Sequence, residues 1–375
     1  MGVFGGPDLS ESGLVLALDG ANSKGFDDDE NLLTYSEDFA NAIWQKQNGF
    51  SITSNTAIAP DGTLTADTAS RVNLGSEFLY QIYGAAGTFT LSCWVRTVTG
   101  TSTFNMFGYN GTNGTVGDVQ YTATTTWQRF STTATVTTST GWYPCIPAVS
   151  GVQLYIWGAQ LERSSSPSPY YPTTGTAKTR GTTWSDLSGN GNNGTLTNGP
   201  TFDSSNLGSI VFDGVNDYFN MTSNFNIAGV TNYSSSFWVN LNSSTTGVDV
   251  RFFWHGNYGV LVYKTTANNL SFYLRTTVTN IQTATPFSSF IGVWTNIAVT
   301  YDGSTMRLYV NGDLKNSASH SGGIVNDNPT RFWLGGASTQ YFTSCKISGV
   351  LEYNRALTAQ EIQQNFNATR SRYSI

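Results

Sequence analysis

The chain has 375 residues, of which 11% are charged and 14% are aromatic, and its formal net charge is −6. So few charges exclude a protein built mainly of helices, because the wet faces of helices need Glu, Lys and Arg. The acidic balance gives no general reason to bind nucleic acid or an anionic membrane. The 39 glycines, with abundant Thr, Ser and Asn, favour short strands joined by tight turns. The sequence therefore predicts an all-β protein, long enough for two cores.

Segments that direct a chain to a membrane are not evident in the sequence. No stretch approaches the roughly 20 apolar residues of a membrane helix. Residues 1–12 lack the charged-then-apolar pattern of a signal peptide, so we expect synthesis in a cytoplasm. The odd, widely spaced cysteines Cys93, Cys145 and Cys345 argue against a disulfide framework. Cys93 and Cys345 are expected to be small buried hydrophobes.

The N-terminal half begins with an apolar run at residues 13–18, which predicts a strand buried on both faces. The acidic run at residues 27–30 indicates a solvated linker. A β-rich region extends from 31 to about 163 and ends in a Ser/Pro stretch that cannot continue a central strand. Residues 170–180 are expected to form a return linker.

The C-terminal half contains hairpin turns and one helix. Asp302-Gly303 and Asn311-Gly312 supply the positive φ that tight hairpins require. Thr358 and Glu361 form a capping box, and Leu357 with Ile362 has the spacing of a hydrophobic staple. These signals predict a short helix near the C-terminus, which we expect to cap one end of a sandwich.

Five motifs carry a family resemblance. They are Thr-Trp-Ser-Asp-Leu-Ser-Gly at 183–189, Ile-Val-Phe-Asp-Gly at 210–214, Trp-Thr-Asn-Ile-Ala-Val-Thr-Tyr-Asp-Gly at 294–303, Leu-Tyr-Val-Asn-Gly at 308–312 and Tyr-Asn-Arg-Ala-Leu-Thr at 353–358. Together they resemble the laminin-G-like, concanavalin A-like lectin/glucanase fold over about residues 181–375. Residues 5–8 and 13–22 resemble the opening strand of the same domain in phage structural proteins.

In those phage proteins the opening strand runs straight into the motif found here at 183–189. About 150 residues intervene in this chain. The resemblance therefore predicts a split outer domain, residues 1–26 and 181–375, with a second module inserted at 27–180. Insertions of this kind are tolerated at exposed loops whose ends lie close together.

The inserted region has its own resemblance. Residues 31–39 open it and residues 154–162 close it, and the pair resembles the carbohydrate-binding-module-like jelly roll of phage virion proteins. Residues 364–373 resemble the tails of cyanophage structural proteins. The implied fold is all-β, with two β-sandwich (jelly-roll) domains, one inserted into the other, and a short C-terminal helix.

Catalytic patterns are missing from the sequence. A glycosidase of this fold needs two carboxylates close across the scissile bond, typically in Glu-x-Asp-x-x-Glu along one strand, and no such motif occurs. After residue 180 the only glutamates are Glu352 and Glu361, and Glu361 belongs to the helix cap. The two histidines, His255 and His320, do not mark a triad. We therefore predict a protein that is not an enzyme.

Calcium is the one plausible metal, because the resemblance implies modules that often hold one structurally. The oxygen ligands that Ca²⁺ prefers are available at Glu37 and Asp38 in the insert, or at Asp213 and Asp217 in the outer domain. Related late strands often carry an acidic residue where Ser348 stands here, which weakens the outer-domain site. No other cofactor is expected.

Sugar binding depends on aromatic faces that stack on pyranose CH groups, with polar neighbours as hydrogen-bond partners. Strand alternation places Trp94 and Arg96 on one face of a strand whose other face is apolar. The alternative is that Trp94 packs under a loop or against the partner domain. Further candidates are Tyr155 and Trp157, the loop aromatics Trp142 and Tyr143, and the cluster Trp254, His255, Asn257 and Tyr258. Core positions are expected for Trp238, Trp294 and Trp333.

Two lectin-like modules without a catalytic carboxylate pair predict a structural protein of a tailed-phage virion. It would act as a capsid decoration or tail-fibre adhesion module that binds host-surface glycan non-covalently. Its partners would be other virion proteins and that glycan, with no nucleic acid or membrane, and a homo-oligomer remains open. One alternative is a purely architectural component that docks on another virion protein. Another is a polysaccharide-degrading glycosidase.

Overall fold

The computed structural model describes most of the chain as two compact units. The described residues are 8–22, 24–27, 29–47, 49–72, 78–110, 114–137, 140–147, 151–221, 226–242, 249–256, 259–267, 269–278, 280–286, 291–325, 331–336 and 341–375. The outer unit comprises residues 1–27 and 181–375, and the inserted unit comprises residues 28–180. Each unit has its own hydrophobic core. In the described residues no helix is long and apolar enough to cross a membrane.

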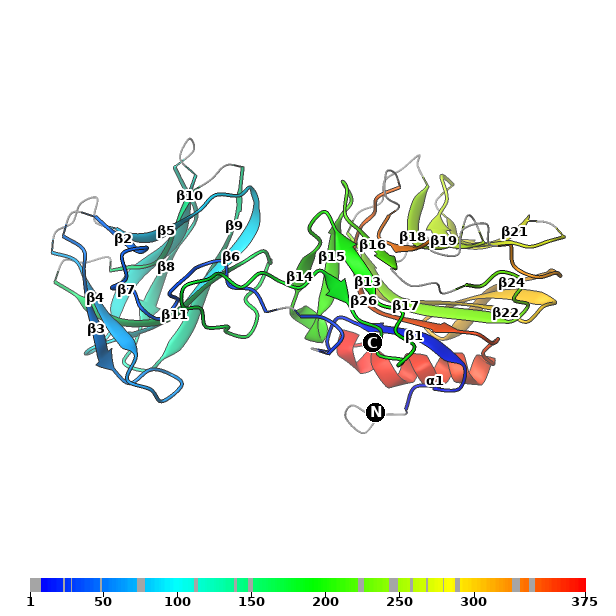
Figure 1. Cartoon of the computed structure of the whole chain (residues 1–375), viewed down its shortest axis with the longest axis horizontal. Helices are drawn as coiled ribbons and strands as arrows, with labels where there is room; N and C mark the ends of the chain where they lie inside the picture. Colours follow the sequence, from blue (N-terminus) through cyan, green and yellow to red (C-terminus); the bar gives the residue numbers. More distant parts are fainter. Residues whose placement is uncertain are drawn as a thin grey trace. The chain divides into compact units, whose positions relative to one another are not determined.

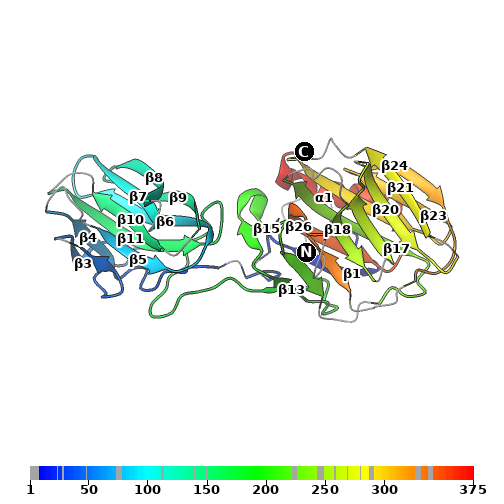
Figure 2. The same cartoon turned by 90° about the horizontal axis from the view of Figure 1, so that it is seen from above.

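The inserted unit is a β-sandwich of two five-stranded sheets, ordered β2-β5-β10-β7-β8 and β3-β4-β11-β6-β9 among its described residues. Its strands are β2 Gln45–Lys46, β3 Ser51–Ala57, β4 Ala66–Ser70, β5 Leu79–Tyr83, β6 Gly87–Thr97, β7 Ser102–Asn110, β8 Gly114–Ala123, β9 Gln128–Val136, β10 Thr140–Pro147 and β11 Gln153–Glu162. Figure 2 looks down on these strands. The two inner faces enclose the core.

Alternation along β6 decides which side chains enter that core. Leu91, Cys93 and Val95 are fully buried between the sheets, and the intervening Trp94 and Arg96 face outward. The expectation that Cys93 is a small buried hydrophobe is confirmed, and burial raises the pKa of its thiol to about 12. Cys345 is likewise buried and free, whereas the side chain of Cys145 lies outside the described residues.

The outer unit contains two eight-stranded sheets within the described residues. The first has the order β14-β15-β26-β17-β22-β23-β24, with β1 paired to β26, and the second has the order β12-β13-β16-β25-β18-β19-β20-β21. The first-sheet strands are β1 Leu14–Asp19, β14 Thr201–Asp203, β15 Ser209–Asp213, β17 Tyr233–Leu241, β22 Trp294–Tyr301, β23 Thr305–Val310, β24 Asp313–Ser319 and β26 Ser344–Tyr353. The second-sheet strands are β12 Thr183–Trp184, β13 Gly194–Thr197, β16 Tyr218–Met221, β18 Val250–His255, β19 Val260–Lys264, β20 Asn269–Arg275, β21 Asn280–Pro286 and β25 Phe332–Leu334.

The all-β prediction, with a short C-terminal helix, is confirmed. Strand β1 pairs antiparallel with β26, so the outer unit joins the two ends of the chain in one sheet. Leu16 and Leu18 enter the core, while Leu14 packs into a cluster on the other face. The predicted burial on both faces is thus met only in part, because Leu16 and Leu18 are buried and the other residues of β1 are half-buried.

Helix α1, Ala359–Thr369, begins with the predicted capping box of Thr358 and Glu361. Leu357 and Ile362 share one apolar cluster with Tyr309 of β23, and Phe366 stacks on Trp238 of β17. The expectation that this helix caps the end of a sandwich was wrong, because α1 lies across the outer face of the first sheet (Figure 1). Its apolar stripe meets the rings that project from that face.

The acidic run at 27–30 differs from the predicted solvated linker at its last residue. Glu30 is 1% exposed and accepts a hydrogen bond from the backbone of Arg163 at 2.5 Å. The guanidinium groups of Arg163 and Arg180 lie 3.3 and 3.6 Å from its carboxylate. Sequence composition could not reveal these partners because they lie more than a hundred residues further along the chain.

Candidate functional site

The outer face of the β3–β9 sheet is divided into a covered half and an open half. Residues 164–169, the Ser/Pro stretch that follows β11, lie over the covered half. There Thr90 donates to the carbonyl of Ser164 at 2.7 Å, and Arg129 donates to the carbonyl of Ser168 at 2.5 Å. Gln160 donates to the Ser168 hydroxyl at 3.0 Å. The Ser/Pro stretch therefore supplies hydrogen-bond partners to polar outer residues of this half.

The open half carries Trp94, Arg96, Trp127 and Tyr155, which we call the aromatic platform. All four side chains are half-buried, and the three rings belong to one cluster. The guanidinium carbon of Arg96 lies 4.5 Å from the ring centre of Tyr155 and 5.1 Å from that of Trp127. These cation–π contacts hold long side chains in a fixed arrangement before any ligand arrives.

Strand register brings the platform together. Arg96 of β6 is opposite Tyr155 of β11, and Trp94 is opposite Trp157. Opposite residues of an antiparallel pair share one face of the sheet, so alternation within each strand fixes the direction of these side chains. Trp127 precedes β9, and its indole N–H donates to the carbonyl of Ile58 at 2.9 Å. Trp127 was not among the predicted sugar contacts, because it precedes β9 and so lies outside the alternating run of that strand.

Trp157 supports the platform from below and offers almost no surface. It is 4% exposed, and the ring of Tyr170 covers it at a centroid distance of 4.8 Å. Its indole donates to the hydroxyl of Thr65 at 3.0 Å. Gly158 follows with φ +64°, and a Cβ there would lie 3.2 Å from both Trp94 and Tyr170. The prediction of Trp157 as a sugar contact is therefore corrected to a packing role.

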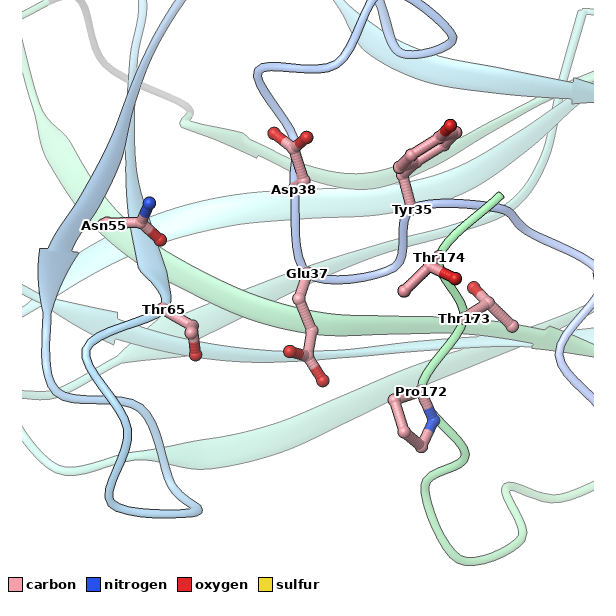
Figure 3. Close-up of a pocket in the computed structure, with 8 residues that line it drawn as sticks. All are labelled: Tyr35, Glu37, Asp38, Asn55, Thr65, Pro172, Thr173 and Thr174. Atoms are coloured by element: carbon pink, nitrogen blue, oxygen red, sulfur yellow. The ribbon is translucent and has the colours of Figure 1, made fainter. Parts of the chain in front are cut away.

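A pocket of about 240 Å³ lies in the inserted unit (Figure 3). Its lining consists of Tyr35, Glu37, Asp38, Asn55, Thr65, Pro172, Thr173 and Thr174. The hydroxyl of Tyr170 donates to Glu37 at 3.1 Å, and burial raises the pKa of the Glu37 carboxyl. Thr65 lines the pocket and also accepts a hydrogen bond from the indole of Trp157, which lies beneath the platform. Hydroxyl, amide and carboxylate groups therefore lie beside the aromatic cluster.

The predicted calcium ligands Glu37 and Asp38 line this pocket but do not converge. In Figure 3 their carboxylates extend in opposite directions from neighbouring backbone positions. Within the described ranges, no three His, Cys, Asp or Glu residues form a group that could hold a metal ion. Calcium requires six to eight oxygens around one point, so this pair does not fit the ion.

Asp213 and Asp217 serve a turn. The backbone N–H groups of Val215 and Asn216 donate to Asp213 at 2.7 and 3.3 Å. Asp217 is 3% exposed and accepts from the backbone of Asp213 at 3.1 Å. Burial, with a contribution from the Asp213 charge, raises the pKa of Asp217 to about 7. Beside these two carboxylates, the described residues include no third His, Cys, Asp or Glu that would complete a metal-binding group.

The loop position expected for Trp142 and Tyr143 was wrong, because both belong to β10. Trp142 is fully buried and its ring lies 5.7 Å from that of Phe89 in the core. Tyr143 is 7% exposed and stacks on Phe107 at 4.4 Å. Neither ring presents a face to a ligand, because the sandwich uses both for packing.

Two of the predicted sugar-binding residues of the outer unit, Trp254 and His255, project from opposite faces of β18. His255 is fully buried with its Nδ1 3.6 Å from the carboxylate of Glu352, and Tyr233 donates to the same carboxylate. These three side chains are sealed between the sheets and do not reach a ligand. Trp254 projects from the outer face and is 6% exposed. Asn257 and Tyr258 lie outside the described residues.

Comparison with known proteins agrees with this fold. Residues 213–363 match the family model of the concanavalin A-like lectin/glucanases superfamily. No curated protein sequence matches the chain.

Solved structures that resemble the chain include binding domains of Paraclostridial Mosquitocidal Protein 1 and of botulinum neurotoxins. The binding domain of Paraclostridial Mosquitocidal Protein 1 is 21% identical, with a TM-score of 0.43 and 49% of each chain covered. The receptor-binding domain of botulinum neurotoxin type G is 18% identical, with a TM-score of 0.40 and coverage of 48% of this chain and 47% of that one. That of the botulinum neurotoxin C/D mosaic serotype is 16% identical, with a TM-score of 0.42 and 48% of each chain covered. The chain thus spans about half the length of these structures.

Proposed function

We propose that the protein is an adhesion or decoration module that binds a surface glycan non-covalently through the aromatic platform of its inserted unit. The observation that carries this proposal is the convergence of Trp94, Arg96, Trp127 and Tyr155 on the open half of one sheet face. Aromatic rings fixed by a cation accept the CH faces of pyranose rings.

The proposal includes no catalytic step. In the outer unit, both glutamates that follow residue 180 are engaged elsewhere. Glu352 is enclosed in the core of the outer unit, and Glu361 belongs to the helix cap. A glycosidase needs two carboxyl groups facing a shared open cleft. Binding without hydrolysis is therefore the activity that fits these residues.

A place on a phage particle is the finer part of the proposal. Its support is the resemblance of residues 31–39, 154–162 and 364–373 to phage virion proteins. The host-surface glycan would then be the ligand, and other capsid or tail proteins would be the attachment partners. Electron cryo-microscopy of particles that carry the chain tests this assignment: a position with the platform facing solvent agrees with it, and a platform buried against another virion protein favours the architectural role.

The binding test uses the full chain on a glycan array, followed by calorimetric titration with the glycans that bind. Trp94→Ala is expected to weaken affinity about tenfold or more, because a stacking face is lost. Trp94→Phe is the matched variant: it keeps a ring, and the indole N–H has no hydrogen-bond partner among the described residues.

Tyr109→Ala is the control, because Tyr109 is 40% exposed on β7 of the other sheet. Unchanged affinity in the Trp94→Ala variant, with an intact melting transition, would show that the platform is not the binding site. Release of reducing ends from a bound glycan would contradict the absence of catalysis.

A further inference from the structure

The second sheet of the outer unit carries an outward row of large side chains. Trp333 of β25 is opposite Trp254 of β18 and also opposite Asn220 of β16. Leu261 of β19 is opposite both Trp254 and Tyr273 of β20. The row crosses five neighbouring strands, so it extends about 19 Å at the usual strand spacing.

Aromatic rings from adjacent positions widen this row. Tyr218 stacks on Trp333 with centroids 5.5 Å apart and an interplanar angle of 20°. Trp254 lies 5.8 Å from Trp333. The outward rings, which we call the ring face, are Tyr218, Trp254, Tyr263, Tyr273, Trp333 and Tyr341. Trp254 and Leu261 are 6% and 4% exposed and form the floor, while the other rings are half-buried and remain accessible.

The ring face is separate from the core of the outer unit. Val260, Phe272 and Phe332 point inward from the same strands and belong to the main core. Helix α1 covers the outer face of the first sheet, whereas among the described residues no helix lies over the outer face of the second (Figure 1). The expected core position of Trp333 is thus corrected to a half-buried position on the outer face.

The charge of this sheet is opposite to that of the whole chain. Its eight strands, as the structure describes them, contain no Asp or Glu. Arg251 lies over Trp254 at 4.3 Å and over Tyr341 at 3.5 Å. Arg331 is exposed beside Trp333 at 5.9 Å, and Arg275 ends β20. Asp249 precedes β18 and Asp217 precedes β16, so among the described residues the three arginines outnumber the acidic residues beside these strands, in a chain of charge −6.

We infer that the ring face is a second ligand site, which binds an anionic polysaccharide along the row from Tyr218 to Tyr273. The half-buried rings accept sugar CH faces, and the exposed Arg331 and half-buried Arg275 pair with carboxylate, sulfate or phosphate groups of the polymer. Arg251 is 6% exposed and instead holds the rings in place. The accessible rings, together with arginines beside strands that contain no Asp or Glu in their described residues, favour a polymer of acidic sugars as the occupant. The site goes beyond the proposed platform because it lies in the other unit and uses different residues.

The experiment titrates the full chain with a polyuronate and with a neutral β-glucan of matched length, following tryptophan fluorescence. Polyuronate binding that weakens with added salt is expected, because its carboxylates pair with arginines. Arg331→Gln is expected to lower polyuronate affinity about threefold to tenfold and to reduce the salt dependence. Trp333→Ala is expected to lower it tenfold or more, and Trp333→Phe restores most of the affinity.

The Trp94→Ala variant separates this site from the platform. It is expected to retain polyuronate binding, and Trp333→Ala is expected to retain any glycan binding at the platform. Arg331 is exposed, so its variant remains informative if Trp333→Ala does not fold. The inference is overturned if the chain binds no polyuronate, or if it binds a single-stranded oligonucleotide more strongly. It is also overturned if Arg331→Gln, Trp333→Phe and Trp333→Ala all leave the polyuronate affinity unchanged.

Discussion

Individual residues show how the same residue type takes different roles in this protein. Trp94 and Trp333 are half-buried on outer faces, whereas Trp142 is fully enclosed in a core. Alternation correctly placed Trp94 on the outer face of its strand. Alternation does not predict which part of that face another segment covers, because this depends on where distant residues, such as 164–169, pack.

Asp217 is a residue whose ionisation opposes folding. Its folded pKa of about 7 is above the usual carboxyl value, so the folded state binds more protons than the unfolded state between about pH 4 and 7. Stability therefore falls as pH rises through this window. Asp217→Asn is expected to raise the free energy of unfolding at pH 8 by roughly 2 kcal/mol, because the amide oxygen can still accept from Asp213.

Urea unfolding at pH 5 and pH 8 measures this effect, with the gain expected at pH 8 and small at pH 5. Asp313→Asn is the control, because that carboxylate is 71% exposed beside Lys315. A loss of stability at pH 8 would contradict the account. Calcium-dependent melting that disappears in the Asp217→Asn variant would instead establish Asp213 and Asp217 as metal ligands.

Among the elements, α1 is the one whose beginning the sequence predicted in detail. Glu361 contacts Arg355 at 2.6 Å and accepts from the backbone N–H of Thr358 at 2.9 Å. The Arg355 hydrogen bonds are the largest cause that lowers the pKa of Glu361 to about 2. Its stabilising effect is therefore present above the ordinary carboxyl pKa of about 4.3 and is lost as pH falls toward 2.

We expect Glu361→Gln to lower the free energy of unfolding by about 1 kcal/mol at pH 7. The difference from the native chain should shrink toward pH 2.5, since the native carboxyl becomes protonated there. Thermal unfolding followed by circular dichroism at the two pH values measures it. An equal loss at both pH values would indicate that the charge of Glu361 is unimportant.

At the scale of the whole molecule, the inserted unit closes on itself. Its core is distinct from that of the outer unit, and Asn31 and Lys178 exchange two backbone hydrogen bonds of 2.8 and 2.9 Å near its ends. In the outer unit, the backbone N–H of Gly181 donates to the carbonyl of Asp27 at 2.9 Å, so the residues on either side of the inserted unit also lie together. In each unit, the two chain segments next to the insertion points therefore lie side by side, as insertion at a loop requires.

Residues 28–180 expressed alone are consequently expected to fold cooperatively. The fragment should also bind platform glycans within about twofold of the full chain, because all platform residues lie inside it. Joining residue 27 to 181 through a short Gly/Ser linker should give a folded outer unit. Chemical denaturation and titration of both fragments test this, and a fragment that unfolds without the other unit would contradict independent cores.

The sequence by itself determined the all-β class, the turns, the helix cap and the outward direction of Trp94, Arg96 and Tyr155. Each depends on local chemistry: positive φ at glycines, a side chain that reaches three residues along, and alternation within one strand.

Only the tertiary structure decided which of these faces stay open. Residues 164–169 cover half of one sheet, α1 covers another, and Tyr170 closes over Trp157. Trp127 joins the platform because β9, which it precedes, pairs with β6, and Trp333 joins the ring face because β25 pairs with β18. Burial depends on packing between segments distant in the sequence, and no pattern within one strand encodes it.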